Sequence, residues 1–196
     1  MDKVTTDRRW NAALALGPVE LSVADLDRSE RYYRGSLGME LIAREGAHAR
    51  FGVAGRTMLV LTEIPETKPA PSSSPGLSHV ALDVPARAHL ARFARHYSQS
   101  HTDGDLRDHI VSESCYVLDP DGHTVEITCG RPRDEWSWQN GLPVLVADAM
   151  TLADLAVEGL GRGQPTVGDL QLHVADRGRG AARPRGGRPR GRFVPW

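Results

Sequence analysis

The sequence predicts an α+β fold made of two tandem βαβββ units. The first observation is an internal repeat, because the segment that begins at Gly17 resembles the segment that begins at Gly76, 59 residues later. The second is that apolar and polar residues alternate in both segments, as they do in a half-buried strand. The third is that a helical pattern and three further strand-like segments follow each copy.

The first unit is expected at residues 15–63. Its first strand places Val19, Leu21 and Val23 on one face. Asp25 stands where a helix N-cap is expected, because its side chain can accept a hydrogen bond from a free amide of the first turn. The helix is expected to bury Leu26, Tyr33 and Leu37 and to stop at Gly35 and Gly38, and strands are expected at 39–44, 48–53 and 57–63.

The second unit is expected at residues 76–130. Pro85 stands where the first helical position is expected, and strands are predicted at 109–113, 115–118 and 124–129. The last two strands are joined by the turn sequence Asp-Pro-Asp-Gly at 119–122. A tight hairpin at this turn would set Cys115 opposite Glu126 and leave His123 exposed.

The remaining segments differ from these units in composition. Residues 1–14 are expected to be an extension, and residues 64–75, with four Pro and three Ser, a linker. A Trp-containing connecting segment is expected at 131–167. Residues 168–176 repeat the first strand once more, but the apolar helix pattern that should follow is replaced by Arg and Pro. Residues 177–196 contain seven Arg and no acid, and are expected to be a disordered tail.

Composition narrows the function classes and the compartment. The net charge is −1, and the basic tail lacks interleaved aromatic residues, so nucleic acid is not the expected partner. The longest apolar run near the N-terminus has five residues, too few for a signal peptide or a membrane span. Two cysteines make no disulfide framework, which is typical of a reducing compartment. We therefore expect a cytoplasmic protein with no membrane contact.

Two groups of motifs identify a family. Leu16-Gly17-Pro18-Val19, with Asp25-Leu26 and Leu37-Gly38-Met39 after it, is similar to the opening of a glyoxalase-type unit. Asp108-His109-Ile110-Val111-Ser112-Glu113, followed by the turn at 119–122, Glu126-Ile127 and Arg131-Pro132, resembles bacterial catechol-2,3-dioxygenase-like proteins. These belong to the vicinal oxygen chelate (glyoxalase/bleomycin resistance/extradiol dioxygenase) superfamily. The resemblance covers about residues 15–176 and implies a cup-like incomplete barrel of mostly antiparallel strands. Such proteins usually have four units, with the iron site in the second pair, whereas the third unit is only begun here.

The resemblance also implies a metal site. The superfamily places metal ligands on the first and last strand of each unit, and in this sequence those positions are Glu20, Val60, His79 and Glu126. Strand alternation puts Glu20, His79 and Glu126 on the face opposite the apolar side chains. One imidazole and two carboxylates suit a divalent ion, with Fe(II) the first choice and Mn or Zn the others. The alternative is that these are polar groups on a solvated sheet face.

Two further residues are candidate site residues, and the sequence is compatible with three functions. His109, in the family-like Asp-His-x-Val-Ser-Glu stretch, could donate to a substrate oxygen or be a surface histidine at a strand end, and Tyr116 could line the cup or only pack. The favoured function is a metal-dependent, extradiol-type ring-cleaving oxidoreductase acting on a small aromatic diol, with a glyoxalase-type lyase or isomerase less favoured. The alternatives are a metal-free small-molecule-binding protein of the resistance type and an inactive truncated remnant. A homodimer is compatible with each of these.

Overall fold

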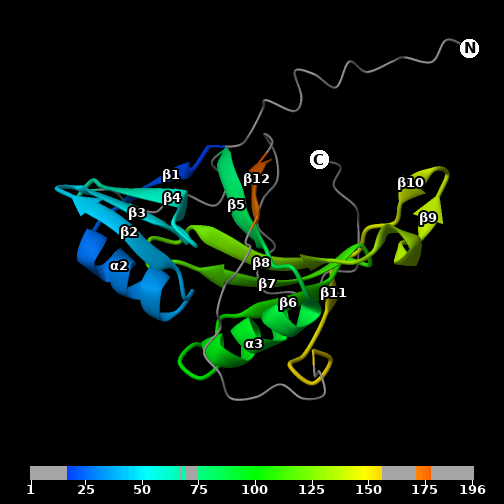
Figure 1. Ribbon diagram of the computed structural model, residues 1–196. Helices are drawn as coiled ribbons and strands as arrows, with labels where there is room; N and C mark the ends of the chain where they lie inside the picture. Colours follow the sequence, from blue (N-terminus) through cyan, green and yellow to red (C-terminus); the bar gives the residue numbers. More distant parts are fainter. Residues whose placement is uncertain (1–16, 67, 69–74, 156–170, 178–196) are drawn as a thin grey trace, which may run out of the picture.

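The computed structural model describes residues 17–66, 68, 75–155 and 171–177. The expected extension at 1–14, most of the linker and the basic tail after residue 177 lie outside the described residues. The described part contains the two predicted βαβββ units (Figure 1). They share one hydrophobic core cluster. No helix among the described residues is both long enough and apolar enough to cross a membrane.

The first unit is a four-stranded sheet covered by one helix. Asp25 caps the helix as predicted, because its carboxylate accepts a hydrogen bond from the Arg28 backbone amide at 2.8 Å. The helix buries Leu26 and Tyr33. The strand order is β1-β4-β3-β2, with β1 parallel to β4 and the other pairs antiparallel. The elements are β1 (Val19–Val23), α2 (Leu26–Gly35), β2 (Glu40–Glu45), β3 (His48–Val53) and β4 (Arg56–Glu63).

The second unit contributes to a six-stranded sheet of order β11-β6-β7-β8-β5-β12. Strand β5 is parallel to β8 and the other pairs are antiparallel. A hairpin of β9 (Trp138–Gln139) and β10 (Leu142–Pro143) projects from the sheet after the short 3-10 helix Arg133–Glu135 (Figure 1). The elements of the sheet and its helix are β5 (Gly76–Asp83), α3 (Arg87–Tyr97), β6 (Asp105–Asp108), β7 (Ser112–Leu118), β8 (Thr124–Gly130), β11 (Asp148–Ala149) and β12 (Gln171–Arg177).

Two predicted boundaries in the second unit are wrong. The strand expected at 109–113 is a turn over residues 109–111, because β6 ends at Asp108 and β7, which contains residues 112 and 113, begins at Ser112. The turn is closed by a hydrogen bond from the His109 amide to the Ser112 carbonyl at 2.8 Å, and Ile110 adopts a φ of 69° within it. Helix α3 begins at Arg87, two residues after Pro85, and its N-cap Ala86 makes no side-chain cap bond.

The β7–β8 hairpin forms as predicted, but its register is shifted by one residue. Leu118 pairs with Thr124, so that Tyr116, and not Cys115, lies opposite Glu126. A shift of one residue moves each side chain to the other face of the sheet. Tyr116 therefore shares the face of Glu126. Cys115 is a free, buried thiol, and burial raises its pKa to about 12.

The loop of this hairpin joins the two units. Asp119 and Asp121 are both buried and both contact the α2 region of the first unit. The Tyr33 hydroxyl donates to Asp119 Oδ2 at 3.0 Å, and Arg28 Nη2 donates to Asp121 Oδ1 at 2.7 Å. Buried carboxylates that accept several hydrogen bonds are costly to disturb. The hairpin loop thus fixes the first helix against the second unit.

His123, which the sequence suggested would be exposed, belongs to this junction. Its Nδ1 lies 2.9 Å from Asp119 Oδ2, and its side chain is only 26% exposed. The hydrogen bond to Asp119 raises the pKa of His123 above its ordinary value of 6.5.

The raised pKa predicts how stability changes with pH. A histidine whose pKa is higher in the folded state stabilises the fold fully below about pH 6.5 and loses that contribution as pH rises through the folded pKa. We expect the thermal midpoint to fall across this window and His123→Gln to flatten the fall. Differential scanning fluorimetry from pH 5.5 to 8.5 measures the thermal midpoint. The control is His48→Gln, because His48 is exposed. An unchanged pH slope in His123→Gln would contradict the assignment.

Candidate functional site

Three of the predicted site residues lie side by side on one face of the six-stranded sheet. Strand β8 lies between β5 and β7, and Glu126 of β8 pairs with Ala81 on one side and Tyr116 on the other. His79 precedes Ala81 by two residues and therefore shares its face. The strand order thus brings His79, Glu126 and Tyr116 together.

His79 and Glu126 form a buried pair. His79 Nε2 lies 3.0 Å from Glu126 Oε2, and the two side chains are 12% and 9% exposed. Burial alone would raise the pKa of Glu126, but hydrogen bonds from His79, Ser114 and Tyr116 outweigh it and lower the pKa below its ordinary value. Glu126 is therefore held as a carboxylate.

Tyr116 stays protonated beside this carboxylate. Burial, followed by the charge of Glu126, raises the pKa of the Tyr116 phenol far above its ordinary value. The His79 and Tyr116 rings meet edge to face, with centroids 5.7 Å apart. Tyr116 therefore keeps its single hydroxyl proton, which it can donate to Glu126.

His109 extends the polar chain toward the connecting segment. Its Nε2 lies 3.0 Å from the Tyr116 hydroxyl and its Nδ1 lies 2.6 Å from the Val146 carbonyl. A carbonyl can only accept, so the Nδ1 atom carries a proton. In the neutral ring, Nε2 is then an acceptor, so His109 and Glu126 are alternative acceptors for the single Tyr116 hydroxyl proton. The four residues His79, Glu126, Tyr116 and His109 thus form a continuous polar chain.

Glu20 is not part of this group. It lies on β1 in the other sheet, is exposed, and accepts a hydrogen bond from Thr62 Oγ1 at 2.6 Å. Over residues 17–66, 68, 75–155 and 171–177, no three His, Cys, Asp or Glu side chains are arranged to hold a metal ion. The structure therefore brings together two of the three expected ligands.

A different repeat alignment explains the position of Glu20. The helix N-caps Asp25 and Ala86 are 61 residues apart. In the first unit, Leu21 of the first strand pairs with Leu61 of the last strand. In the second unit, Leu82 of the first strand pairs with Ile127 of the last strand. Leu21 and Leu82 therefore occupy equivalent positions in the two units. With this offset the counterpart of His79 is Pro18, and the counterpart of Glu20 is Ala81.

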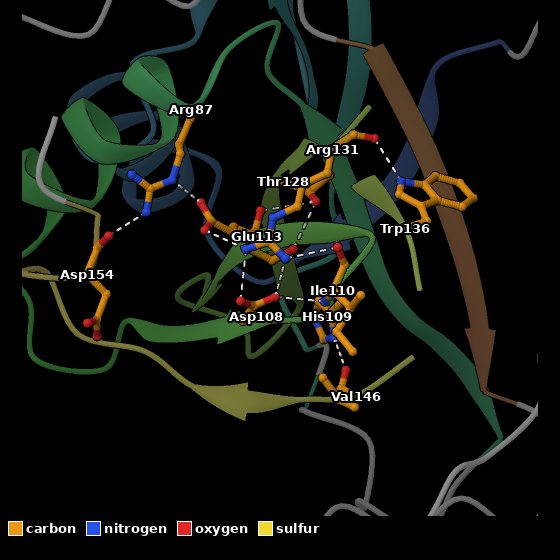
Figure 2. A network of polar contacts seen from close by, with 11 residues as sticks. Arg87, Asp108, His109, Ile110, Glu113, Thr128, Arg131, Trp136, Val146 and Asp154 are labelled. Carbon is orange, nitrogen blue, oxygen red and sulfur yellow. Dashed lines mark hydrogen bonds and ion pairs between the residues drawn. The ribbon is translucent and has the colours of Figure 1, made fainter. Parts of the chain in front are cut away.

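A second polar network, which the sequence did not predict, supports the turn that carries His109 (Figure 2). Arg131 donates to both carboxylate oxygens of Asp108, at 2.6 and 2.8 Å, and to the Ile110 carbonyl at 2.9 Å. It also reaches Glu113 at 2.8 Å, while Arg87 reaches the other oxygen of Glu113 at 2.6 Å. Hydrogen bonds from Arg131 lower the pKa of Asp108 and those carboxylates raise the pKa of Arg131.

The network also fixes the start of the connecting segment. The Trp136 indole donates to the Arg131 carbonyl at 2.8 Å (Figure 2). Trp136 also stacks on Trp138, with ring centroids 5.8 Å apart. The guanidinium of Arg133 lies 4.6 Å from the Trp138 ring centroid. The only indication of this network in the sequence was that Asp108, Glu113 and Arg131 all lie in the motifs that resemble catechol-2,3-dioxygenase-like proteins.

Comparison with known proteins gives one family. The family model described as "Glyoxalase/Bleomycin resistance protein/Dioxygenase superfamily" matches residues 15–127. A catechol-2,3-dioxygenase of Bacillus subtilis (strain 168) is 31% identical over 176 residues, which are 82% of this chain and 60% of that protein. The chain thus spans about three fifths of the length of this relative.

Solved structures agree on the fold. The cppA protein from Streptococcus pneumoniae TIGR4 superposes with a TM-score of 0.57 at 16% identity, over 79% of this chain and 58% of that one. A glyoxalase/bleomycin resistance protein/dioxygenase from Alicyclobacillus acidocaldarius gives a TM-score of 0.51 at 19% identity, over 62% and 95%. At these identities the likeness concerns the fold alone.

Proposed function

Because the chain belongs to the glyoxalase/bleomycin resistance protein/dioxygenase superfamily, we propose that it is a metal-dependent oxidoreductase that cleaves a small aromatic diol. The observation that carries this proposal is the buried His79–Glu126 pair, in which an imidazole nitrogen and a carboxylate oxygen lie 3.0 Å apart. The likeness to a catechol-2,3-dioxygenase supports the reaction class.

The donor set fits a divalent ion held by two protein ligands. Imidazole and carboxylate suit Fe(II), Mn or Zn, and Glu126 is already ionised, as a ligand must be. With Glu20 in the other sheet, the remaining coordination positions would fall to substrate oxygens and water. When bound, the ion would act as a Lewis acid that lowers the pKa of adjacent diol hydroxyls.

The residues of this chain would handle the released proton. A proton arriving from a substrate hydroxyl at the Tyr116 oxygen would be balanced by transfer of the tyrosine proton to His109 Nε2, 3.0 Å away. The positive charge would then lie on an imidazole whose Nδ1–H is held by the Val146 carbonyl. Tyr116 and His109 would thus act as a relay, and Tyr116 would also present its ring to an aromatic substrate.

The test is metal binding by the purified chain. We expect Fe(II), Mn(II) or Zn(II) to bind, and His79→Ala to weaken binding at least about tenfold, the usual effect of losing a ligand or its support. Glu126 keeps its bonds from Ser114 and Tyr116 in that variant, so the chain should stay folded. The matched control is Glu20→Ala, which should bind metal like the wild type. Elemental analysis and oxygen consumption with catechol give the two readouts.

The second candidate is a metal-free small-molecule-binding protein. It is favoured by one observation, that the described residues contain no group of three metal-ligating side chains. In this case catechol-type ligands should quench the Tyr and Trp fluorescence equally with and without a chelator. If the wild type takes up none of the three metals even in excess, the enzyme proposal falls and this one replaces it.

A further inference from the structure

The face of the six-stranded sheet that carries the candidate site also carries a permanent positive charge. Arg107 of β6 lies opposite Ser114 of β7, and directly opposed residues of an antiparallel pair share a face. Ser114 is two residues from Tyr116, which lies opposite Glu126, so all four side chains belong to this face. Across β5, β6, β7, β8 and β11, Arg107 is the only lysine or arginine.

The connecting segment orients Arg107 together with His109. Arg107 Nη1 donates to the Ala147 carbonyl at 3.3 Å. The preceding carbonyl, that of Val146, lies 2.6 Å from His109 Nδ1 (Figure 2). Two consecutive carbonyls thus hold the two side chains. Because His109 also contacts the Tyr116 hydroxyl, Arg107 is held beside the end of the polar chain that starts at His79.

Arg107 keeps hydrogen-bond donors for a ligand. Its Nη2 donates to Asp105 Oδ2 at 2.8 Å, and the Asp105 side chain is 52% exposed. An ion pair with so exposed a carboxylate contributes little to stability, so a ligand can displace it. A guanidinium has five N–H donors, and the contacts with Asp105 and Ala147 use two of them. The planar group can therefore bind a carboxylate through two parallel hydrogen bonds.

We propose that Arg107 determines the specificity of the site, and that the substrate is an aromatic diol that also carries a carboxylate. The inference rests on the proposed function, in which the adjacent oxygens of the diol bind at His79 and Glu126. One strand separates β6 from β8, so the backbones that carry Arg107 and Glu126 are roughly 10 Å apart. An aromatic ring with its carboxylate across from the diol spans this gap, over the Tyr116 ring of the strand between them.

A pair of matched ligands tests this specificity. Protocatechuate is catechol with a carboxylate on the ring, and isothermal titration calorimetry of the purified chain, with and without Zn(II), compares the two. We expect protocatechuate to bind about tenfold more tightly, the usual effect of charge-assisted hydrogen bonds. Arg107→Met should bring the two affinities together. Arg107→Lys keeps the charge but not the planar fork, and should keep part of the difference. The control is Arg95→Met, exposed on α3, which should keep all of it.

Asp105 provides a change in the opposite direction. Asp105→Asn removes the carboxylate that competes for Arg107, so the preference for protocatechuate should widen. Equal affinities in the wild type, binding of neither ligand, or a preference that survives in Arg107→Met would overturn the proposal. Metal uptake and oxygen consumption with catechol decide the proposed function separately, because neither requires a carboxylate on the ring.

Discussion

Asp119→Ala should lower the free energy of unfolding by about 3 kcal/mol, since a buried acceptor that is removed leaves its donors unpaired. The Asp119 side chain is fully buried. Its carboxylate accepts hydrogen bonds from the Asp121 and His123 amides at 3.0 and 2.7 Å, and from the Tyr33 hydroxyl at 3.0 Å. These bonds hold both the hairpin loop and the contact between the two units.

Urea denaturation followed by circular dichroism measures this loss. The control is Asp27→Ala, because Asp27 is 66% exposed and its ion pair with Arg44 lies on the surface. Such a pair contributes roughly 0–1 kcal/mol. Asp119→Ala should also remove the pH dependence of stability assigned to His123, because Asp119 is the hydrogen-bond partner of His123. A loss no larger than that of Asp27→Ala would show that the loop does not join the units.

The βαβββ units were predictable because their signals are local. Alternation in β1 and β5, the cap at Asp25 and the turn at 119–122 each act within a few residues. The failures concern register. A period-two pattern looks the same after a shift of two residues, so alternation could not distinguish an offset of 59 from one of 61. The spacing of the helix N-caps could have done so.

The same limit explains the site. His79 and Glu126 were assigned to the correct strands, and the parallel β5–β8 pairing brings them together. Tyr116 was placed one residue out of register with Glu126, because the turn sequence alone does not reveal that the loop includes His123. The network of Arg87, Glu113 and Arg131 joins elements that are distant in the sequence, and no local pattern reports such contacts.

Arg131→Met should be the second strongly destabilising change, at about 3 kcal/mol near pH 7. Glu113 is 5% exposed and would keep only Arg87 as its cationic partner. Asp108 would lose both of its bonds to Arg131 and keep the Ile110 amide. Removing one member of a buried ion pair leaves an uncompensated charge, which typically costs several kcal/mol.

The stability lost in Arg131→Met should decrease as the pH falls. Arg131 lowers the pKa of Asp108 in the folded protein. The resulting stability is present above the unfolded pKa, near 3.9, and disappears as pH falls through the folded pKa. Urea midpoints of Arg131→Met and the wild type should therefore differ most near pH 7 and converge toward pH 3. The surface variant Arg50→Met, which breaks an exposed pair with Glu45, is the control and should cost less than about 1 kcal/mol.

A second change separates charge from packing. Adding Glu113→Gln to Arg131→Met removes the uncompensated charge while keeping the side-chain volume, so part of the lost stability should return. The His109 ring should also respond, because Arg131 holds the turn that places it between Tyr116 and Val146. Imidazole ¹⁵N shifts of His109 should move in Arg131→Met and stay in place in Arg50→Met. Wild-type stability and unchanged His109 shifts in Arg131→Met would show that the network has no positioning role.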